Sequence, residues 1–270
     1  MDAAEFLGLR ATHNPVRWYL EVVPGICTDD QFLFGGCGLG AAIEALERTT
    51  GRPAVWASAQ YLSFARPPEM MDIDVFVTQA GHQTTQARAV AHVGDRQILA
   101  VTAALGERDA VYDGQWATFP DVPMPDDCPT RERISRVDDS LARRLDMRVA
   151  RGRDESTSPE DDLAGHSALW ARFPAGLGLS AASLAVLGDY VPFGVAQVLG
   201  RFVTGSSLDN TIRVCSLEPT EWVLIDVHVD AITNGIGHGR VDLWSEDHRL
   251  LAAASQSCVV RPRRSRAVSS

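Results

Sequence analysis

Residues 181–200, AASLAVLGDYVPFGVAQVLG, form a long apolar stretch with one acidic residue, Asp189, near its middle. The stretch predicts a buried helix over about 180–200. A carboxylate in apolar surroundings is costly unless other groups bond it, so Asp189 should have polar partners. Two candidates are Ser207, in the following segment RFVTGSSLDN, and Gln256, in the small and apolar segment LAAASQSCVV. We expect the three residues to meet around one water molecule.

Pro192 predicts a local kink in this helix. Proline has no N–H, so it leaves the carbonyl of Gly188, beside Asp189, without its usual hydrogen-bond donor.

The composition is that of an ordinary folded protein. The 270 residues are 45% apolar, enough for one large or two ordinary domains. The N-terminus lacks the pattern of a signal peptide, and no run of about 18 apolar residues is free of charged or turn residues. We therefore expect a cytoplasmic protein with no membrane span. The five cysteines show no CxxC spacing, and their odd number indicates free thiols rather than a disulfide framework.

The charge distribution bears on possible partners. A net charge of −10 argues against nucleic acid or an anionic membrane as a partner of the main body. The exception is a basic cluster near the C-terminus, which could contact phosphate or form a solvated tail: Arg261, Arg263, Arg264 and Arg266.

Hydrophobic periodicity predicts two sets of elements in the same order. The first set is an opening strand at 12–24, a helix in FLFGGCGLGAAIEALERTTG (32–51), and strands at 54–64, 72–80, 83–94 and 96–105, with a tight hairpin at Gly94-Asp95. The second set is strands at 145–151 and 167–174, a helix at 180–200, and strands at 208–217, 221–231, 236–245 and 249–260. The Pro-, Asp- and Arg-rich region up to residue 144 predicts a surface connector, and residues 151–165 a mobile loop.

The two sets are related by a constant offset of 152 residues. Ile73-Asp74-Val75 and Ile225-Asp226-Val227 are separated by this offset, which also pairs Trp18 with Trp170. The sequence therefore predicts an α+β chain of two tandem modules, residues 1–115 and 145–270, joined by a connector over 116–144. We expect one continuous sheet with both helices on its concave face.

The motif Gly36-Cys37-Gly38-Leu39-Gly40-Ala41 fits the dinucleotide pattern GxGxxA, but the strands after it form hairpins rather than βαβ units. These glycines are better explained by a helix start that lies close to the sheet.

The offset also indicates which polar residues serve function rather than folding. It pairs Asp189 with Cys37, Ser207 with Val55 and Gln256 with Ala104, so the first copy lacks all three polar side chains. Each has a structural alternative: Asp189 could face solvent, Ser207 could cap a turn, and Gln256 could lie on an edge strand. Their absence from the first copy favours a single functional site in the second module.

Several stretches together resemble acyl-CoA thioesterases of the type II, double-hotdog (TesB-like) class. They are LFGGCGLGAAIEAL, FARPPE, ARAVAHVGDRQILAVTAALG, LAVLGDYVPFGVAQVLG, SSLDN and LLAAASQSCVVR, and they span nearly the whole chain except the connector. The resemblance implies a double hotdog fold, hydrolysis of acyl-CoA in fatty acid metabolism, association into homo-oligomers, and no cofactor beyond the CoA of the substrate.

The resemblance also implies site residues. Its Asp on the second helix, its Thr or Ser two residues before a strand Asp, and its Gln on the last strand fall on Asp189, Ser207 and Gln256. The candidate substrate-binding residues are Gly36, Tyr61, Arg66 and Gly188. Many members carry a histidine where this chain has Tyr61, a departure that bears on the acyl pocket or its specificity and not on the catalytic assignment.

Thioester hydrolysis suits these residue types. It needs a positioned water, an acceptor that polarises it, and donors for the developing oxyanion. Asp189 would be the base, Ser207 and Gln256 would hold the water and the carbonyl, and amides near Gly188 or Gly194 could supply the oxyanion donors. A serine hydrolase is disfavoured because Ser207 has no apparent histidine partner.

Other function classes fit less well. The seven histidines show no HExxH or HxxxH spacing, so no metal site is expected. His228 and His238 are expected to be partly exposed strand residues. A hydratase or dehydratase of the same fold would need an Asp and His pair at the helix start, which Cys37 and Asp189 do not provide. The non-enzymatic alternative is a protein that binds acyl-CoA or an acyl carrier without turnover.

Overall fold

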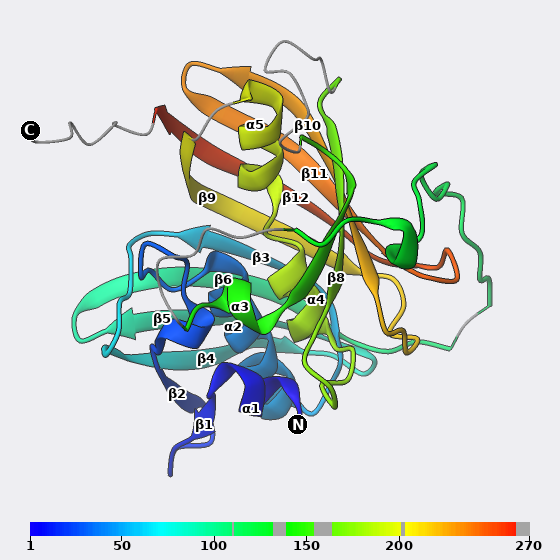
Figure 1. Ribbon diagram of the computed structural model, residues 1–270. Coiled ribbons are helices and arrows are strands. Elements are labelled where there is room, and N and C mark those ends of the chain that lie inside the picture. Colours follow the sequence, from blue (N-terminus) through cyan, green and yellow to red (C-terminus); the bar gives the residue numbers. More distant parts are fainter. Residues whose placement is uncertain (110, 132–138, 154–163, 201–202, 263–270) are drawn as a thin grey trace, which may run out of the picture.

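The computed structural model describes residues 1–109, 111–131, 139–153, 164–200 and 203–262. The end of the basic cluster beyond Pro262 and most of the loop expected over 151–165 lie outside the described residues. The described strands form one twelve-stranded sheet with helices packed on its inner face (Figure 1).

The N-terminal half supplies the first six strands of this sheet. Its elements are α1 (Ala3–Leu7), β1 (Arg10–Ala11), β2 (Arg17–Glu21), η1 (Pro24–Ile26), α2 (Gly35–Thr50), β3 (Ala54–Tyr61), β4 (Met70–Ala80), β5 (Thr84–Val93) and β6 (Arg96–Gly106). Gly94, with φ 56°, makes the turn of the predicted hairpin between β5 and β6.

The C-terminal half repeats this pattern. After η2 (Pro125–Asp127) and α3 (Leu141–Arg144) come β7 (Asp146–Arg151), β8 (His166–Arg172), α4 (Ala181–Leu187), α5 (Val191–Leu199), β9 (Val203–Val214), β10 (Val223–Thr233), β11 (Ile236–Ser245) and β12 (Leu250–Pro262).

The two halves meet edge to edge through β3 and β9. Their pairing runs from Trp56 opposite Arg213 to Gln60 opposite Asp209. The strand order is β1-β2-β4-β5-β6-β3 in one half and β9-β12-β11-β10-β8-β7 in the other. One order is the reverse of the other, as in a two-fold dimer. The predicted tandem repeat and continuous sheet are therefore confirmed.

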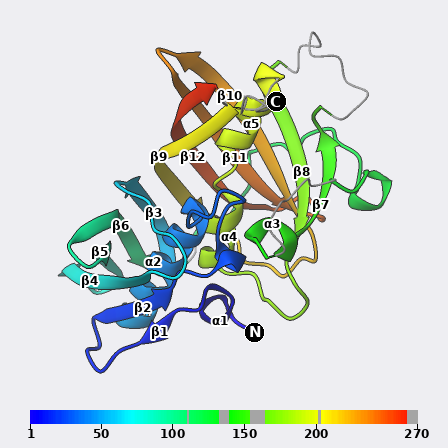
Figure 2. The same cartoon turned by 60° about the vertical axis from the view of Figure 1, so that its left-hand side comes forward.

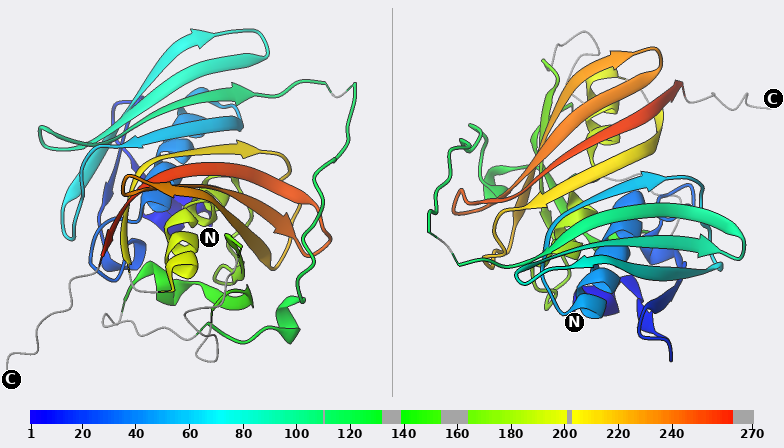
Figure 3. Two further views of the ribbon diagram at one scale, coloured as in Figure 1. Left: turned by 90° about the horizontal axis from the view of Figure 1, so that it is seen from above. Right: turned by 180° about the vertical axis from the view of Figure 1, so that it is seen from behind.

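The helices lie under the arched sheet, as the view from above shows (Figure 3). The predicted helix at 180–200 is two helices in the structure, because the chain turns at Gly188 to Tyr190 between α4 and α5. Pro192 occupies the first turn of α5, where its missing N–H costs no intrahelical bond. The predicted kink is thus a complete break.

The glycines of α2 permit a close contact between the two modules. A Cβ at Gly36 would lie 2.8 Å from the carbonyl oxygens of Ala185 and Val186, and one at Gly40 would lie 2.7 Å from that of Ala182. The sequence predicted that these glycines face the sheet. Helices α2 and α4 lie side by side (Figure 2). Gly36 and Gly40 face the backbone of α4, whereas Gly38 faces a strand side chain, that of Leu99.

We expect Gly40→Ala to lower the free energy of unfolding by about 1–3 kcal/mol, because the new Cβ meets backbone that cannot rotate away. Gly38→Ala is the matched control, since its Cβ would meet only the ends of leucine side chains, Leu99 at 2.9 Å and Leu33 at 3.5 Å. Alanine is also the better helix former by about 1 kcal/mol. Urea unfolding of both variants provides the measurement, and equal stability of the two would contradict the proposed helix contact.

The connector covers part of the outer face of the C-terminal sheet. Trp170 donates its indole N–H to the carbonyl of Pro123 at 2.9 Å, and Phe119 packs edge-on against Trp244. These residues form a small apolar cluster separate from the main core. The outer face is therefore partly buried beneath residues 119–128.

One segment, Ala181–Leu199, has the length and hydropathy of a membrane-spanning helix, with 19 residues and a mean hydropathy of 1.4. In the structure 61% of its most apolar window is buried inside the protein, which is also typical of a core helix.

Candidate functional site

Asp189 lies at the break between α4 and α5, inside the protein, with 4% of its surface exposed. Its carboxylate reaches the first turn of α2 in the other module, where Oδ2 accepts a hydrogen bond of 2.7 Å from the backbone N–H of Gly36. Phe34, the N-cap residue of α2, makes no side-chain cap. Asp189 therefore supplies the anion that the positive end of this helix favours.

Ser207 and Gln256 bond the other carboxylate oxygen. The Ser207 hydroxyl donates to Oδ1 of Asp189 at 3.2 Å, and the side-chain amide of Gln256 donates to the same oxygen. Gln256 Nε2 also donates to Ser207 Oγ at 2.7 Å. The three residues that the sequence singled out thus come together, and they contact one another directly.

A β-bulge directs Ser207 into the site. The register between β12 and β9 shifts between Ser257, opposite Asp209, and Cys258, opposite Ser207, so Leu208 is an extra residue. Because of this residue, Ser207 and the buried Asn210 both face inward, although strict alternation would place them on opposite faces. The strand predicted at 208–217 begins earlier in the structure, at Val203, so Ser207 lies within β9.

Two further contacts hold the break in place. Gln256 Oε1 accepts a bond of 3.2 Å from the N–H of Val191, the first residue of α5. The side-chain amide of Asn210 donates to the Gly188 carbonyl at 3.3 Å, which replaces the donor that Pro192 lacks. Sequence analysis missed Asn210, although the unsatisfied carbonyl of Gly188 was a signal that some donor must be near.

The surroundings of Asp189 alter its acidity. Burial raises the pKa of this carboxyl from 3.8 to about 6, although the hydrogen bonds from Gln256, Gly36 and Ser207 act to lower it. At neutral pH the group is therefore ionised but more basic than an ordinary aspartate. A pKa near the working pH is typical of a general base.

Tyr61, at the end of β3, lies beside the same helix start. A Cβ at Gly35 would meet Oδ2 of Asp189 at 2.6 Å on one side and the Tyr61 ring at 3.0 Å on the other. Within the described part of the chain, the Tyr61 hydroxyl and Oδ1 of Asn210 are buried atoms without a hydrogen bond of good geometry, and the side chains of Tyr61 and Asn210 lie close enough to interact with each other. Such orphaned polar atoms next to a carboxylate are suited to bind a polar group of a ligand.

The other substrate-binding candidates differ in position. Gly36 bonds Asp189 directly, and Gly188 takes part through its carbonyl. The exposed side chain of Arg66 stacks on the Phe32 ring at 4.1 Å, and no contact joins it to the Asp189 cluster among the described residues.

The amides predicted to serve as oxyanion donors are already bonded. The N–H of Gly188 donates to Leu184, and that of Gly194 donates to Tyr190. The amides of Gly188 and Gly194 themselves are therefore engaged in helical turns, and any oxyanion donor near them would have to be another group.

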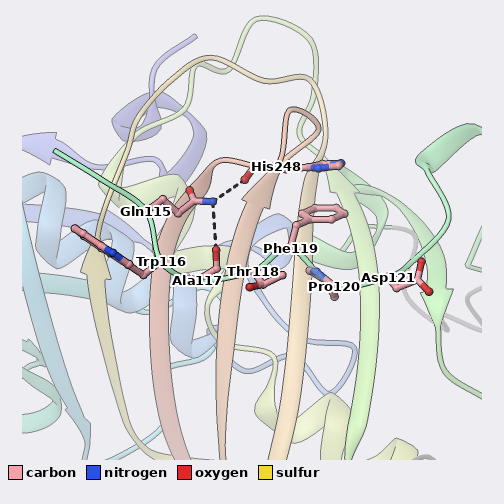
Figure 4. Close-up of a pocket in the computed structure, with 8 residues that line it drawn as sticks. All are labelled: Gln115, Trp116, Ala117, Thr118, Phe119, Pro120, Asp121 and His248. Atoms are coloured by element: carbon pink, nitrogen blue, oxygen red, sulfur yellow. Dashed lines mark hydrogen bonds between the residues drawn. The ribbon is translucent and has the colours of Figure 1, made fainter.

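A pocket elsewhere on the surface, drawn in Figure 4, does not share this chemistry. It is lined by residues 115–121 of the connector and by His248, whose carbonyl accepts a bond from Gln115. Its one acidic residue, Asp121, points away from Gln115 and His248 (Figure 4). The pocket therefore lacks a convergent set of reactive groups.

Comparison with known proteins adds independent evidence. Residues 125–260 match the family described as the acyl-CoA thioesterase C-terminal domain. A protein of Novosphingobium aromaticivorans DSM 12444 proposed to be a thioesterase is 31% identical, with 93% of this chain and 98% of that chain covered and a TM-score of 0.84. A search of curated proteins found no match.

Two more distant structures share the fold. An Alicyclobacillus acidocaldarius protein described as having a hot dog fold has a TM-score of 0.83 at 19% identity, with 96% of this chain and 97% of that chain covered. Acyl-CoA thioesterase II TesB2 of Mycobacterium marinum has a TM-score of 0.76 at 20% identity, with 97% and 99% covered. The predicted double hotdog is therefore confirmed.

Proposed function

The chain belongs to the acyl-CoA thioesterase family and is a thioester hydrolase, and we propose that Asp189 activates the water molecule that cleaves its acyl-CoA substrate. The observation that carries this proposal is a buried carboxylate with a pKa of about 6, fixed by donors from three separate elements. Three donors leave one lone-pair direction of the carboxylate for a water molecule.

In the proposed reaction, the water oxygen attacks the thioester carbonyl carbon while Asp189 takes a proton from the water. The C–S bond then breaks, the CoA thiolate leaves, and the proton held by Asp189 passes to it, which restores the carboxylate. Ser207 and Gln256 keep the carboxylate in one orientation. A fixed orientation lowers the activation barrier because the reacting atoms stay aligned. Donors near the positive end of α2 would stabilise the oxyanion, and the buried Tyr61 hydroxyl is one candidate.

The contacts of Ser207 favour attack by water over a covalent route. Among the described residues, its hydroxyl bonds only Asp189 and Gln256, and no histidine is positioned to take its proton. A serine nucleophile needs such a base.

Some predictions from the sequence remain proposals. We propose that the protein acts in the cytoplasm, in fatty acid metabolism, without a cofactor, and that residues 1–115 and 145–270 are its domain limits. Exposed apolar side chains on β3 and β4, including Val55, Phe76 and Val77, support the proposal of a homo-oligomer.

The direct test measures release of free CoA from acyl-CoAs of short to long chain length with a thiol reagent. We expect saturable, enzyme-dependent release with at least one chain length. Cys215 is an exposed thiol that would also react, so its signal is subtracted with a substrate-free blank or removed in Cys215→Ser. Binding of acyl-CoA without any release would instead indicate the non-catalytic alternative.

A further inference from the structure

His166, Asp226 and His228 form a compact cluster on the C-terminal half of the sheet, away from Asp189. His166 begins β8 and lies directly opposite His228 on β10. Asp226 accepts from the imidazole of His166 at 2.5 Å through Oδ1, and its Oδ2 lies 3.3 Å from Nε2 of His228. The two imidazole rings stack with their centroids 4.2 Å apart.

The cluster lies on the outer face of the sheet. Val227, between its two β10 members, points inward, where its side chain lies 2.7 Å from a Cβ built on Gly194 of α5. Asp226 and His228 therefore point outward, because neighbouring strand residues face opposite sides. Asp226 is 5% exposed at its side chain, and His228 29%, so the cluster is partly closed but can still be reached from solvent.

The geometry is near that of a metal site. One ligand atom from each of the three side chains lies within 4.8 Å of the others. A tetrahedral zinc ion with ligands at about 2.0–2.1 Å places those ligands roughly 3.3 Å apart. Small side-chain rotations would give this spacing. Two imidazoles and one carboxylate are also a common ligand set for zinc and similar ions.

The first module provides an internal comparison. Its equivalent carboxylate, Asp74, lies opposite Arg17, which donates to it twice at 2.6 and 2.9 Å. In the second module the residue opposite Asp226 is Ala168. Asp74 also lies 3.0 Å from Nε2 of His92, but the permanently charged guanidinium neutralises it. The described side chains that bond Asp226 are imidazoles alone, which can ligate a metal when neutral.

The local charge also favours a cation. Asp242 on β11 lies directly opposite Asp226, on the same face. The nearest arginine on that strand, Arg240, is paired with Asp230. A bound divalent cation would offset the two neighbouring negative charges.

We propose that His166, Asp226 and His228 bind a divalent transition-metal ion, for which zinc is the probe. The ion would tie β8 to β10 on the face of the sheet opposite α5. Its role would be to stabilise the fold, and the proposed hydrolysis at Asp189 would not require it.

The test begins with protein stripped by a chelator and titrates it with ZnCl2 against a chromogenic zinc indicator. We expect one saturable site per chain in the wild type and at least ten-fold weaker binding in Asp226→Asn and in His228→Gln. Asp74→Asn is the matched control, because it changes the equivalent carboxylate of the first module, and it should bind as the wild type does. All variants carry Cys215→Ser, which removes the exposed thiol as a competing ligand.

Thermal unfolding provides a second readout. Zinc should raise the melting temperature of the wild type and of Asp74→Asn but not that of His228→Gln, whose side chain is the most exposed of the three ligands. Absence of saturable zinc binding in the wild type would overturn the proposal. Binding that survives in both Asp226→Asn and His228→Gln would overturn it equally, because the ion would then lie elsewhere.

Discussion

Replacement of Asp189 by asparagine should lower kcat for acyl-CoA hydrolysis by about 10²-fold or more. Asparagine keeps the shape of the side chain but cannot take a proton from water. Its oxygen can still accept from the Gly36 amide, so the start of α2 should remain capped. The loss is therefore expected in the chemical step, with little change in KM.

The same change should leave the protein folded. Because burial raises the pKa of Asp189 to about 6, the folded state holds this proton more tightly than the unfolded chain does. The protonated carboxyl contributes to the free energy of unfolding in full below about pH 4. This contribution is lost as the pH rises through about 6, and the loss is on the order of 3 kcal/mol. Asparagine avoids this cost, but its NH2 group would face the donor of Gln256. We expect a melting temperature at pH 7 close to or above that of the wild type.

Two measurements test this account of Asp189. In the wild type, kcat/KM should rise with pH through about 6 and then level off, because the ionised carboxylate is the base. The stability of Asp189→Asn relative to the wild type should increase between pH 4 and pH 7. Full activity in Asp189→Asn would rule out the assignment, and a collapsed fold would indicate a structural role instead.

Much of the architecture could be predicted because it follows from local patterns. The alternation of apolar residues placed the strands, and the repeated Ile-Asp-Val at residues 73–75 and 225–227 indicated two equivalent modules. The isolated charge at Asp189 was informative for the same reason, since an acid in an apolar helix needs partners.

What could not be predicted depends on contacts between distant segments. The bulge at Leu208 changes which residues of β9 face inward, and only the pairing with β12 reveals it. The capping of α2 by Asp189 joins residues of different modules. The cluster at Asp226 has no sequence motif, because His166 comes from another strand and reaches it only through the register of β8 and β10.

Gln256→Ala should lower activity more than any change except that of Asp189. It affects both the position of the catalytic carboxylate and the stability of the fold. It removes the donor to Asp189 and to Ser207, and it leaves the buried N–H of Val191 without its acceptor. We expect kcat to fall by at least ten-fold, and the unpaired amide to cost about 1–3 kcal/mol of stability. The melting temperature should therefore fall together with the activity.

A pH profile tells the two effects apart. The Gln256 hydrogen bond is the largest of the influences that lower the pKa of Asp189, and the bond from Ser207 is a smaller one. In Gln256→Ala the rise of kcat/KM should therefore shift to higher pH, and in Ser207→Ala it should shift less, with a smaller loss of rate. Ser207→Thr keeps the hydroxyl and should leave the midpoint in place. If Gln256→Ala lowers the melting temperature but its midpoint stays at that of the wild type, Gln256 supports α5 rather than the catalytic carboxylate.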